Sequence, residues 1–198
     1  MHGLLRLSGI IDRFNEKIAK AAQWTVLIAV LICSLNAILR KVFSSSEFFQ
    51  TYSNTMFESL FFFFGCMFLL GTAYTLKKDE HVRIDVLVSR YSERTQVWGD
   101  IVGILLFMFP ACILILWYSV GAVEQSILSD EHSGNSPLVL WPFKLLIPLG
   151  FLMLLIQGFS ELIKRIGYLK GLVAYHEFRK GGHNPDDEVK AYIEATKD

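Results

Sequence analysis

Residues 101–123 read IVGILLFMFPACILILWYSVGAV, and none of these 23 side chains is charged. An α-helix rises about 1.5 Å per residue, so this stretch is long enough to cross a hydrocarbon core of about 30 Å. Only Glu58 and Lys144 are charged in the three further stretches of sufficient length, which are residues 21–39, 55–76 and 138–160. The sequence therefore predicts an all-α membrane protein with four transmembrane helices.

The overall composition agrees with this assignment. Hydrophobic residues make up 53% of the chain and charged residues 19%, and nearly all the charge lies between the four apolar stretches. Such segregation excludes a single water-soluble core, a disordered chain and a disulfide scaffold. A membrane β-barrel is excluded as well, because runs such as Leu60–Phe64 do not alternate between apolar and polar residues.

The distribution of Lys and Arg predicts the orientation in the membrane. Two of these residues, Arg40 and Lys41, lie in the loop after the first span, and none lies in residues 124–137. Sixteen lie in the remaining segments outside the spans, which are residues 1–20, 77–96 and those after 160. Because cytoplasmic segments carry the excess of positive charge, both termini are expected to be cytoplasmic.

The chain is expected to divide into three parts: an amphipathic helix over 1–20, a transmembrane domain over 21–163, and a cytoplasmic tail over 164–198 that is loosely ordered from Gly181 onward. The first helix carries an apolar stripe with a helical spacing, formed by Leu4, Leu7, Ile11, Phe14 and Ile18. Beside a span, a basic amphipathic helix of this kind typically lies in the membrane interface; a soluble coiled-coil seam is the alternative. Weaker stripes within 84–98 and 166–173 predict two more short interfacial helices.

The few polar groups inside the spans are candidate packing or partner-contact residues. Glu58, Lys144, Arg40 and Lys41 fall at similar depth near the outer surface in the predicted topology. We expect Glu58 to pair with Arg40 or Lys144, because an intramembrane charge usually has a partner. The alternative is that the two cations extend to water. Asn36 could form a hydrogen bond to a neighbouring helix.

No motif for catalysis or for a cofactor is present. The sequence has no phosphate-binding loop, no zinc-ligand spacing and no nucleophile motif, so an enzyme is not predicted. Asp79, Glu80, His81 and Asp85 match no strong metal-ligand spacing, and a solvated loop at the membrane surface is the favoured interpretation. We expect no cofactor, no metal and no nucleic-acid partner. We expect membrane lipid as a partner.

One ordered set of residues resembles a known family. The stretch from Glu58 to Leu87 reads ESLFFFFGCMFLLGTAYTLKKDEHVRIDVL, with Leu70-Gly71, Ala73-Tyr74 and the pentapeptide HVRID at 81–85. The set also includes Asn36, Arg40, the pentapeptide IPLGF at 147–151, and Gln157. Together, over about residues 15–165, these features resemble the small permease subunit (DctQ-like) of tripartite ATP-independent periplasmic (TRAP) transporters.

The resemblance implies a function for the chain. In such a transporter a large permease subunit holds the substrate and sodium sites, and a periplasmic substrate-binding protein delivers an organic acid. The small subunit then braces the large one in the bacterial inner membrane and helps to dock the binding protein. Structural or partner-contact candidates are Asn36, Arg40, Glu58, His81, Arg83, Asp85 and Lys144.

Two other functions compete with this interpretation. The first is a membrane anchor for a redox enzyme, which would need haem or quinone ligands, and no histidine lies in a span. The second is an autonomous small transporter acting as a homo-oligomer. A transport pathway needs a denser set of intramembrane polar groups than two charges near one surface.

Overall fold

The computed structural model describes residues 2–43, 47–78 and 91–173. The described chain is helical: α1 (His2–Val42), α2 (Glu47–Lys78), α4 (Glu93–Gly103), the π-helical turn η1 (Ile104–Met108), α5 (Phe109–Leu128) and α6 (Trp141–Leu169). One isolated antiparallel bridge joins His132 and Val139 in the connection between α5 and α6. Four helical stretches are long and apolar enough to cross a membrane: Gly3–Val42, Tyr52–Lys78, Glu93–Leu128 and Trp141–Leu169. The four predicted spans lie within or largely within these stretches.

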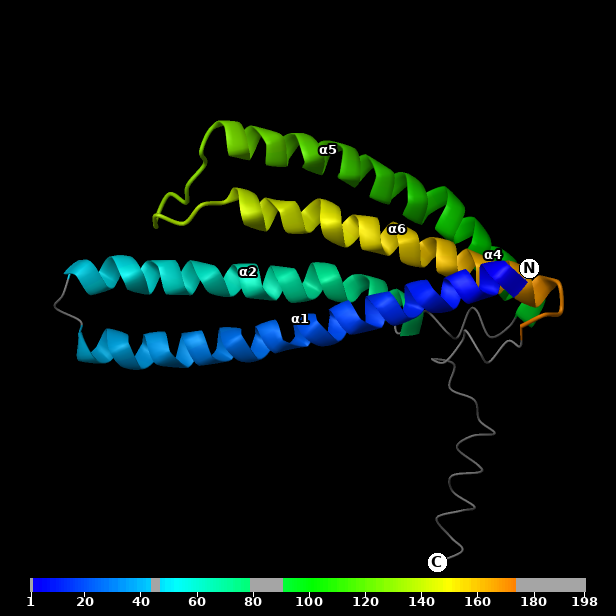
Figure 1. Ribbon diagram of the computed structural model, residues 1–198, viewed down its shortest axis with the longest axis horizontal. Helices are drawn as coiled ribbons and strands as arrows, with labels where there is room; N and C mark the ends of the chain where they lie inside the picture. Colours follow the sequence, from blue (N-terminus) through cyan, green and yellow to red (C-terminus); the bar gives the residue numbers. More distant parts are fainter. Residues whose placement is uncertain (1, 44–46, 79–90, 174–198) are drawn as a thin grey trace, which may run out of the picture.

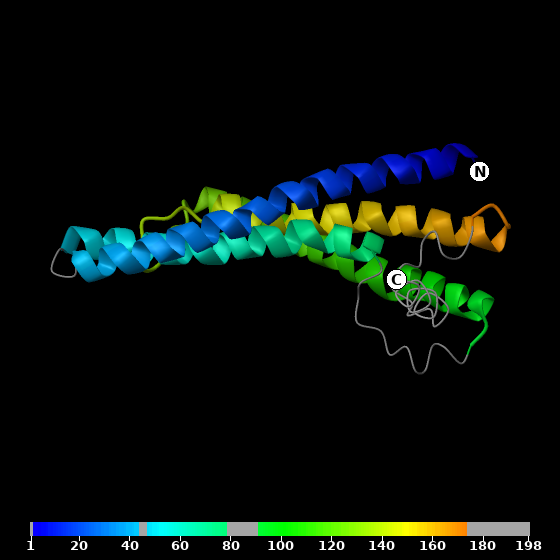
Figure 2. The same cartoon turned by 90° about the horizontal axis from the view of Figure 1, so that it is seen from below.

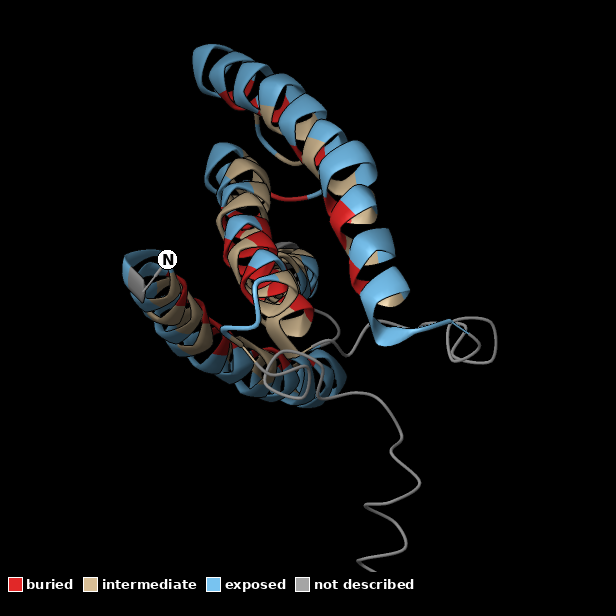
Figure 3. Cartoon of the chain, turned by 90° about the vertical axis from the view of Figure 1, so that its right-hand side faces the viewer, coloured by how far each residue is buried: buried red, intermediate tan, exposed pale blue. Residues whose placement is uncertain are grey.

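The helices lie in a row and do not close into a bundle. Figure 1 shows the order α5, α6, α2, α1, and the N-terminal half of α1 crosses over toward the end of α6. Figure 2 shows the same crossing from below. α6 contacts α1, α2 and α5, so it is the central element of the layer. Most outward surfaces of the helices are exposed, as the end-on view in Figure 3 shows.

The N-terminal helix is not separate from the first span. Residues expected to form an independent interfacial helix over 1–20 continue without a break into α1, which has 41 residues. At about 1.5 Å per residue this helix is about 60 Å long, roughly twice the hydrocarbon thickness. No proline interrupts it. Residues 166–169, expected in another short helix, form the last turn of α6, and Gly171 ends that helix with a φ of 72°.

A repeat of small and polar residues forms the buried face of α1. Ser8, Asn15, Ala22, Ala29 and Asn36 are all buried, and they recur every seven residues. A seven-residue period keeps one seam of a helix against its neighbours, and small side chains let the backbones approach closely. The apolar stripe over residues 4–18 lies mostly on other faces, where Leu4, Leu7 and Phe14 are exposed.

Glycines give α6 its close contacts. A Cβ on Gly150 would lie 2.8 Å from Cβ of Leu69 on α2, and one on Gly158 would lie 2.7 Å from Cε1 of Phe109. Phe109 follows the π-helical turn, where its N–H donates to the carbonyl of Ile104 five residues earlier. Pro110, which has no N–H, comes next, so the widened turn accommodates the proline within a continuous helix.

Candidate functional site: two polar clusters at opposite ends of the helices

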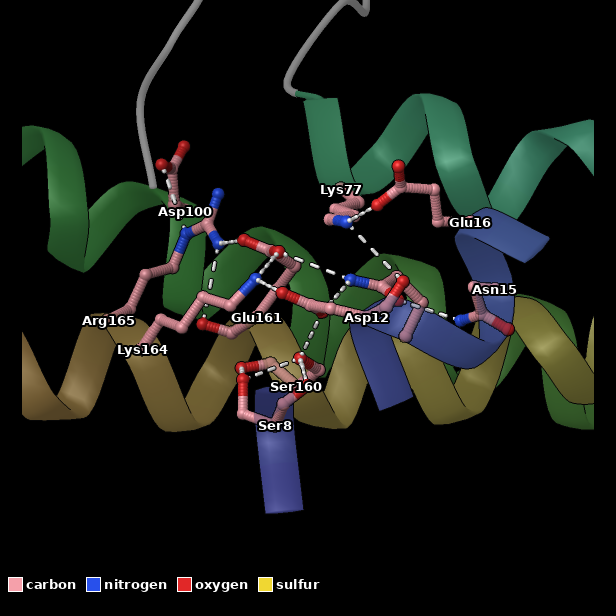
Figure 4. Close-up of polar contacts among 11 residues, drawn as sticks. Ser8, Asp12, Asn15, Glu16, Lys77, Asp100, Ser160, Glu161, Lys164 and Arg165 are labelled. Atoms are coloured by element: carbon pink, nitrogen blue, oxygen red, sulfur yellow. Dashed lines mark hydrogen bonds and ion pairs between the residues drawn. The ribbon is translucent and has the colours of Figure 1, made fainter. Parts of the chain in front are cut away.

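A network of polar side chains joins α1 to α6 near the N-terminal end of α1. Figure 4 shows that α1 and α6 supply most of its members, and that α2 and α4 each add one. We call it the α1–α6 polar network; its members are Ser8, Asp12, Asn15, Glu16, Lys20, Lys77, Asp100, Gln157, Ser160, Glu161, Lys164 and Arg165.

Asp12 is the member of α1 with the most contacts to α6. Its Oδ1 accepts hydrogen bonds from Nε2 of Gln157 at 2.9 Å and from Oγ of Ser160 at 2.8 Å. Its Oδ2 lies 2.7 Å from Nζ of Lys164. These α6 residues occupy successive turns of one helix face, so a single carboxylate binds one stripe of α6. Two further cross-helix bonds flank it, Ser8 to Ser160 at 2.7 Å and Asn15 to Gln157 at 2.7 Å.

Glu161 is the most deeply buried charge of the network. Its side chain is 1% exposed and contacts Nη1 of Arg165 at 2.6 Å and Nζ of Lys164 at 2.8 Å. Arg165 Nε also lies 3.2 Å from Oδ2 of Asp100, which connects α6 to α4. An unpaired charge at such a site is strongly unfavourable, so these ion pairs fix the relative positions of the helices that carry them.

The network also reaches α2 and is balanced in charge. Lys77, at the end of α2, lies 2.8 Å from Oε2 of Glu16, and Lys20 lies 2.9 Å from Oε1 of the same carboxylate. The four carboxylates are Asp12, Glu16, Asp100 and Glu161, and the four cations are Lys20, Lys77, Lys164 and Arg165. Such a self-neutralised set can hold helices together in a medium of low polarity.

This network is not among the predictions from the sequence, although a signal for it is present. The predicted fourth span ends at residue 160, one residue before Glu161, and the prediction for residues 1–20 rests on apolar and basic residues alone. Gln157, Glu161 and Lys164 recur at steps of four and three, and Asp12 and Glu16 are four apart. Two polar stripes of helical spacing beside apolar spans predict contact between the stripes.

A second cluster lies on the N-terminal half of α2, away from Lys77, and we call it the loop anchor: Glu58, Ser133 and Ser136. Oγ of Ser133 donates to Oε1 of Glu58 at 2.7 Å, and Oγ of Ser136 donates to Oε2. The two serines belong to the connection between α5 and α6, which extends toward α2 in Figure 1. The carboxylate therefore ties this connection to α2.

The expected ion pair of Glu58 with Arg40 or Lys144 is wrong among the described residues. Lys144 instead contacts Glu131, which lies in the same connection, and Arg40 is exposed. The α5–α6 connection brings two hydroxyl donors to Glu58 and a carboxylate to Lys144, so each of these side chains has a polar partner from this connection. The hydrogen bond from Lys144 lowers the pKa of Glu131 below its ordinary value.

The remaining sequence candidates have separate locations. Oδ1 of Asn36 accepts a hydrogen bond from Oγ of Ser53 at 2.8 Å, which joins α1 to α2. His81, Arg83 and Asp85 lie outside the described residues, as does most of the expected cytoplasmic tail. Within the described ranges, no group of three or more His, Cys, Asp and Glu side chains is placed to hold a metal ion.

The fold and the two clusters define a multi-pass membrane protein whose described intramembrane charges are mostly paired within the chain. Residues 29–167 match the family described as "Tripartite ATP-independent periplasmic transporters, DctQ component". The chain belongs to this family, the small permease component of TRAP transporters. The family consists of transporter components and not enzymes, and with the four apolar helices it indicates an inner-membrane protein. No curated protein and no solved structure gave a match.

Replacing Glu161 tests the contribution of the network to stability. Glu161→Ala removes one carboxylate partner from both Lys164 and Arg165, and removing one member of a buried pair costs about 3–5 kcal/mol. We expect a clearly lower melting temperature for the purified chain in detergent, and a smaller decrease for Glu161→Gln. Glu124→Ala is the matched control, because Glu124 is an exposed acid on α5. Equal melting temperatures for Glu161→Ala and the control would contradict this role.

A double-mutant cycle tests the partner of Lys144. Lys144→Ala and Glu131→Ala should be non-additive in melting temperature, whereas Lys144→Ala and Glu58→Ala should be additive, because only the first pair is in contact. The coupling should disappear as the pH falls through the lowered pKa of Glu131, since protonation removes the charge that attracts Lys144. Coupling of Lys144 with Glu58, and no coupling with Glu131, would instead support the Glu58–Lys144 ion pair that is expected from the sequence.

Proposed function

We propose that this chain is the small accessory subunit of a sodium-coupled TRAP transporter for organic acids. It braces the large permease subunit in the membrane and helps to dock the periplasmic substrate-binding protein. Membership of the family supports the assignment to a TRAP transporter. The polar network, whose charges are paired within the chain, is the observation that supports the accessory role. Charged groups that neutralise one another hold a scaffold together, whereas a transport pathway needs groups that exchange partners with the substrate.

The bracing role is supported by the shape of the layer. Because the helices lie in a row, many large apolar side chains are exposed in the described chain; they include Phe68, Phe107 and Trp117, the last of which is 80% exposed. Lipid can cover part of this surface. A second membrane protein can pack along the rest by van der Waals contact, which is the main attraction between helices in a bilayer. The large permease subunit is the partner that the family supplies.

The docking role is supported by the construction of the α5–α6 connection. The loop anchor ties it to α2, the bridge between His132 and Val139 closes it, and Lys144 binds Glu131 at its start. A connection held at several points presents a surface of defined shape to a soluble partner. In the proposed orientation, with both termini cytoplasmic, this connection faces the periplasm.

Sodium coupling is assigned to the large subunit, and this chain is proposed to carry no cofactor or catalytic centre. The charged groups in its helices support this assignment. Asp12 binds Lys164, and Glu161 binds both Lys164 and Arg165, so these carboxylates are already neutralised by cations of the protein. A sodium site instead needs oxygen ligands with charge left over for the ion.

Cysteine labelling tests the orientation. In a variant with Cys33, Cys66 and Cys112 replaced by alanine, Gly134→Cys should react with a membrane-impermeant maleimide in spheroplasts. Lys170→Cys should react only after lysis, because the basic segments are expected inside. Both positions are exposed, so accessibility within the protein is matched. Labelling of Lys170→Cys alone before lysis would reverse the topology.

Reconstitution tests the function itself. Liposomes should take up the organic acid that co-purifies with the binding protein only when this chain, the large permease and the binding protein are all present. Glu58→Ala should raise the binding-protein concentration needed for half-maximal uptake several-fold, because the docking connection loses its tie to α2. It should leave co-purification with the large permease and the sodium dependence intact, and Glu124→Ala should change none of these. Uptake by this chain alone, or loss of sodium coupling in Glu58→Ala, would refute the accessory role.

A further inference from the structure

A cavity of about 510 Å³ lies beside the α1–α6 polar network, between the first turns of α1, the end of α2 and the end of α6. Its charged lining consists of Asp12, Glu16, Lys77, Lys78 and Lys164. Figure 4 shows four of these residues, Asp12, Glu16, Lys77 and Lys164, with their polar contacts as dashed lines. The volume is within the range of about 300–1,000 Å³ that is usual for sites of small molecules.

The lining carries one more positive than negative charge. Lys77 is paired with Glu16, and Lys164 is paired with Asp12. Within the described residues, Nζ of Lys78 lies over the ring of Tyr74, 5.6 Å from its centroid, and Tyr74 also lines the cavity. An ammonium over a ring keeps its charge and its N–H donors. The cavity therefore favours a ligand with a single negative charge and several acceptor oxygens.

Apolar side chains in the lining limit the kind of anion. Leu5, Leu172 and Val173 line the cavity together with the charged side chains, so a ligand that fills it must present both a polar head and an apolar body. A small inorganic anion would satisfy only the first requirement. An amphipathic anion satisfies both.

The cavity and the loop anchor are separated along α2 by about the thickness of a membrane. Lys77 follows Glu58 by 19 residues on the single helix α2, which is a rise of about 28 Å. This rise matches the thickness of a hydrocarbon core, about 30 Å. With the loop anchor at one boundary of the membrane, the cavity lies at the other boundary, where lipid headgroups are found.

We propose that this cavity binds the headgroup of a membrane phospholipid, with its singly charged phosphate diester on Lys78 and its glycerol and acyl chains against Leu5, Leu172 and Val173. Lys77 supplies a further donor without leaving Glu16. The bound lipid completes the packing between α1, α2 and α6 at the level of the headgroups.

Native mass spectrometry of the delipidated full chain tests the proposal, with dioctanoyl phosphatidylglycerol as the probe. One molecule should bind saturably. Dioctanoylglycerol, which lacks the phosphate, and inorganic phosphate, which lacks the chains, should each bind at least tenfold more weakly. Binding of dioctanoylglycerol or of inorganic phosphate as tightly as the phospholipid would overturn the assignment.

Two pairs of variants locate the site. Lys78→Ala should weaken phosphatidylglycerol binding at least fivefold. Lys170→Ala, which removes an exposed lysine just after the end of α6, should leave the binding unchanged. Gly9→Leu should block binding without removing a charge, because Gly9 lines the cavity and a Cβ there meets no atom within 4 Å. Gly3→Leu on the same helix is its control, since Gly3 is equally open and does not line the cavity. Unchanged binding in both Lys78→Ala and Gly9→Leu would show that lipid does not occupy this cavity.

Discussion

The contact of Asp12 with Lys164, Gln157 and Ser160 fixes the position of α1 on α6. The alanines of the α1 seam, such as Ala22 and Ala29, do little to define its register, because they pack equally well after a small shift along the neighbouring helix. The half-buried carboxylate of Asp12 cannot make that shift without losing its partners, and the loss is unfavourable where water is scarce. The polar network therefore selects one register from several that the apolar contacts permit.

The rest of the layer depends on α6. It contacts α1, α2 and α5, and its glycines bring two of these neighbours close, α2 at Gly150 and the start of α5 at Gly158. Because α5 and α1 flank α6 on different sides, the four spans form a row with two broad apolar faces. Lipid or another membrane protein must cover those faces, so the architecture itself favours a subunit that works in a complex.

Hydropathy predicted the number and place of the spans because transfer into lipid depends on the composition of a stretch and hardly on its neighbours. The same criterion ends a span at the first charges, so it stopped before Glu161 and divided α1 near residue 20. In the structure both helices continue, since their polar stripes find partners on each other.

The partner of Glu58 was not predictable by depth alone, because the nearest donors, Ser133 and Ser136, come from a connection whose path depends on the tertiary fold. The assignment of His81, Arg83 and Asp85 as structural or partner-contact residues remains a prediction, because these residues lie outside the described part of the chain.

The two clusters stabilise charge in different ways, and this difference bears on what each end of the molecule can do. The α1–α6 polar network is neutral as a set, so its ion pairs need neither water nor a partner protein. Glu58 accepts hydrogen bonds from two uncharged serines, which orient the carboxylate, and it has no ion pair with a cation of the described residues. A carboxylate without such a pair is stable only near water or near a cation from outside the cluster. The end with the ion pairs is thus suited to holding helices together at its membrane boundary, whereas the end with the loop anchor is suited to meeting the aqueous phase and a soluble partner.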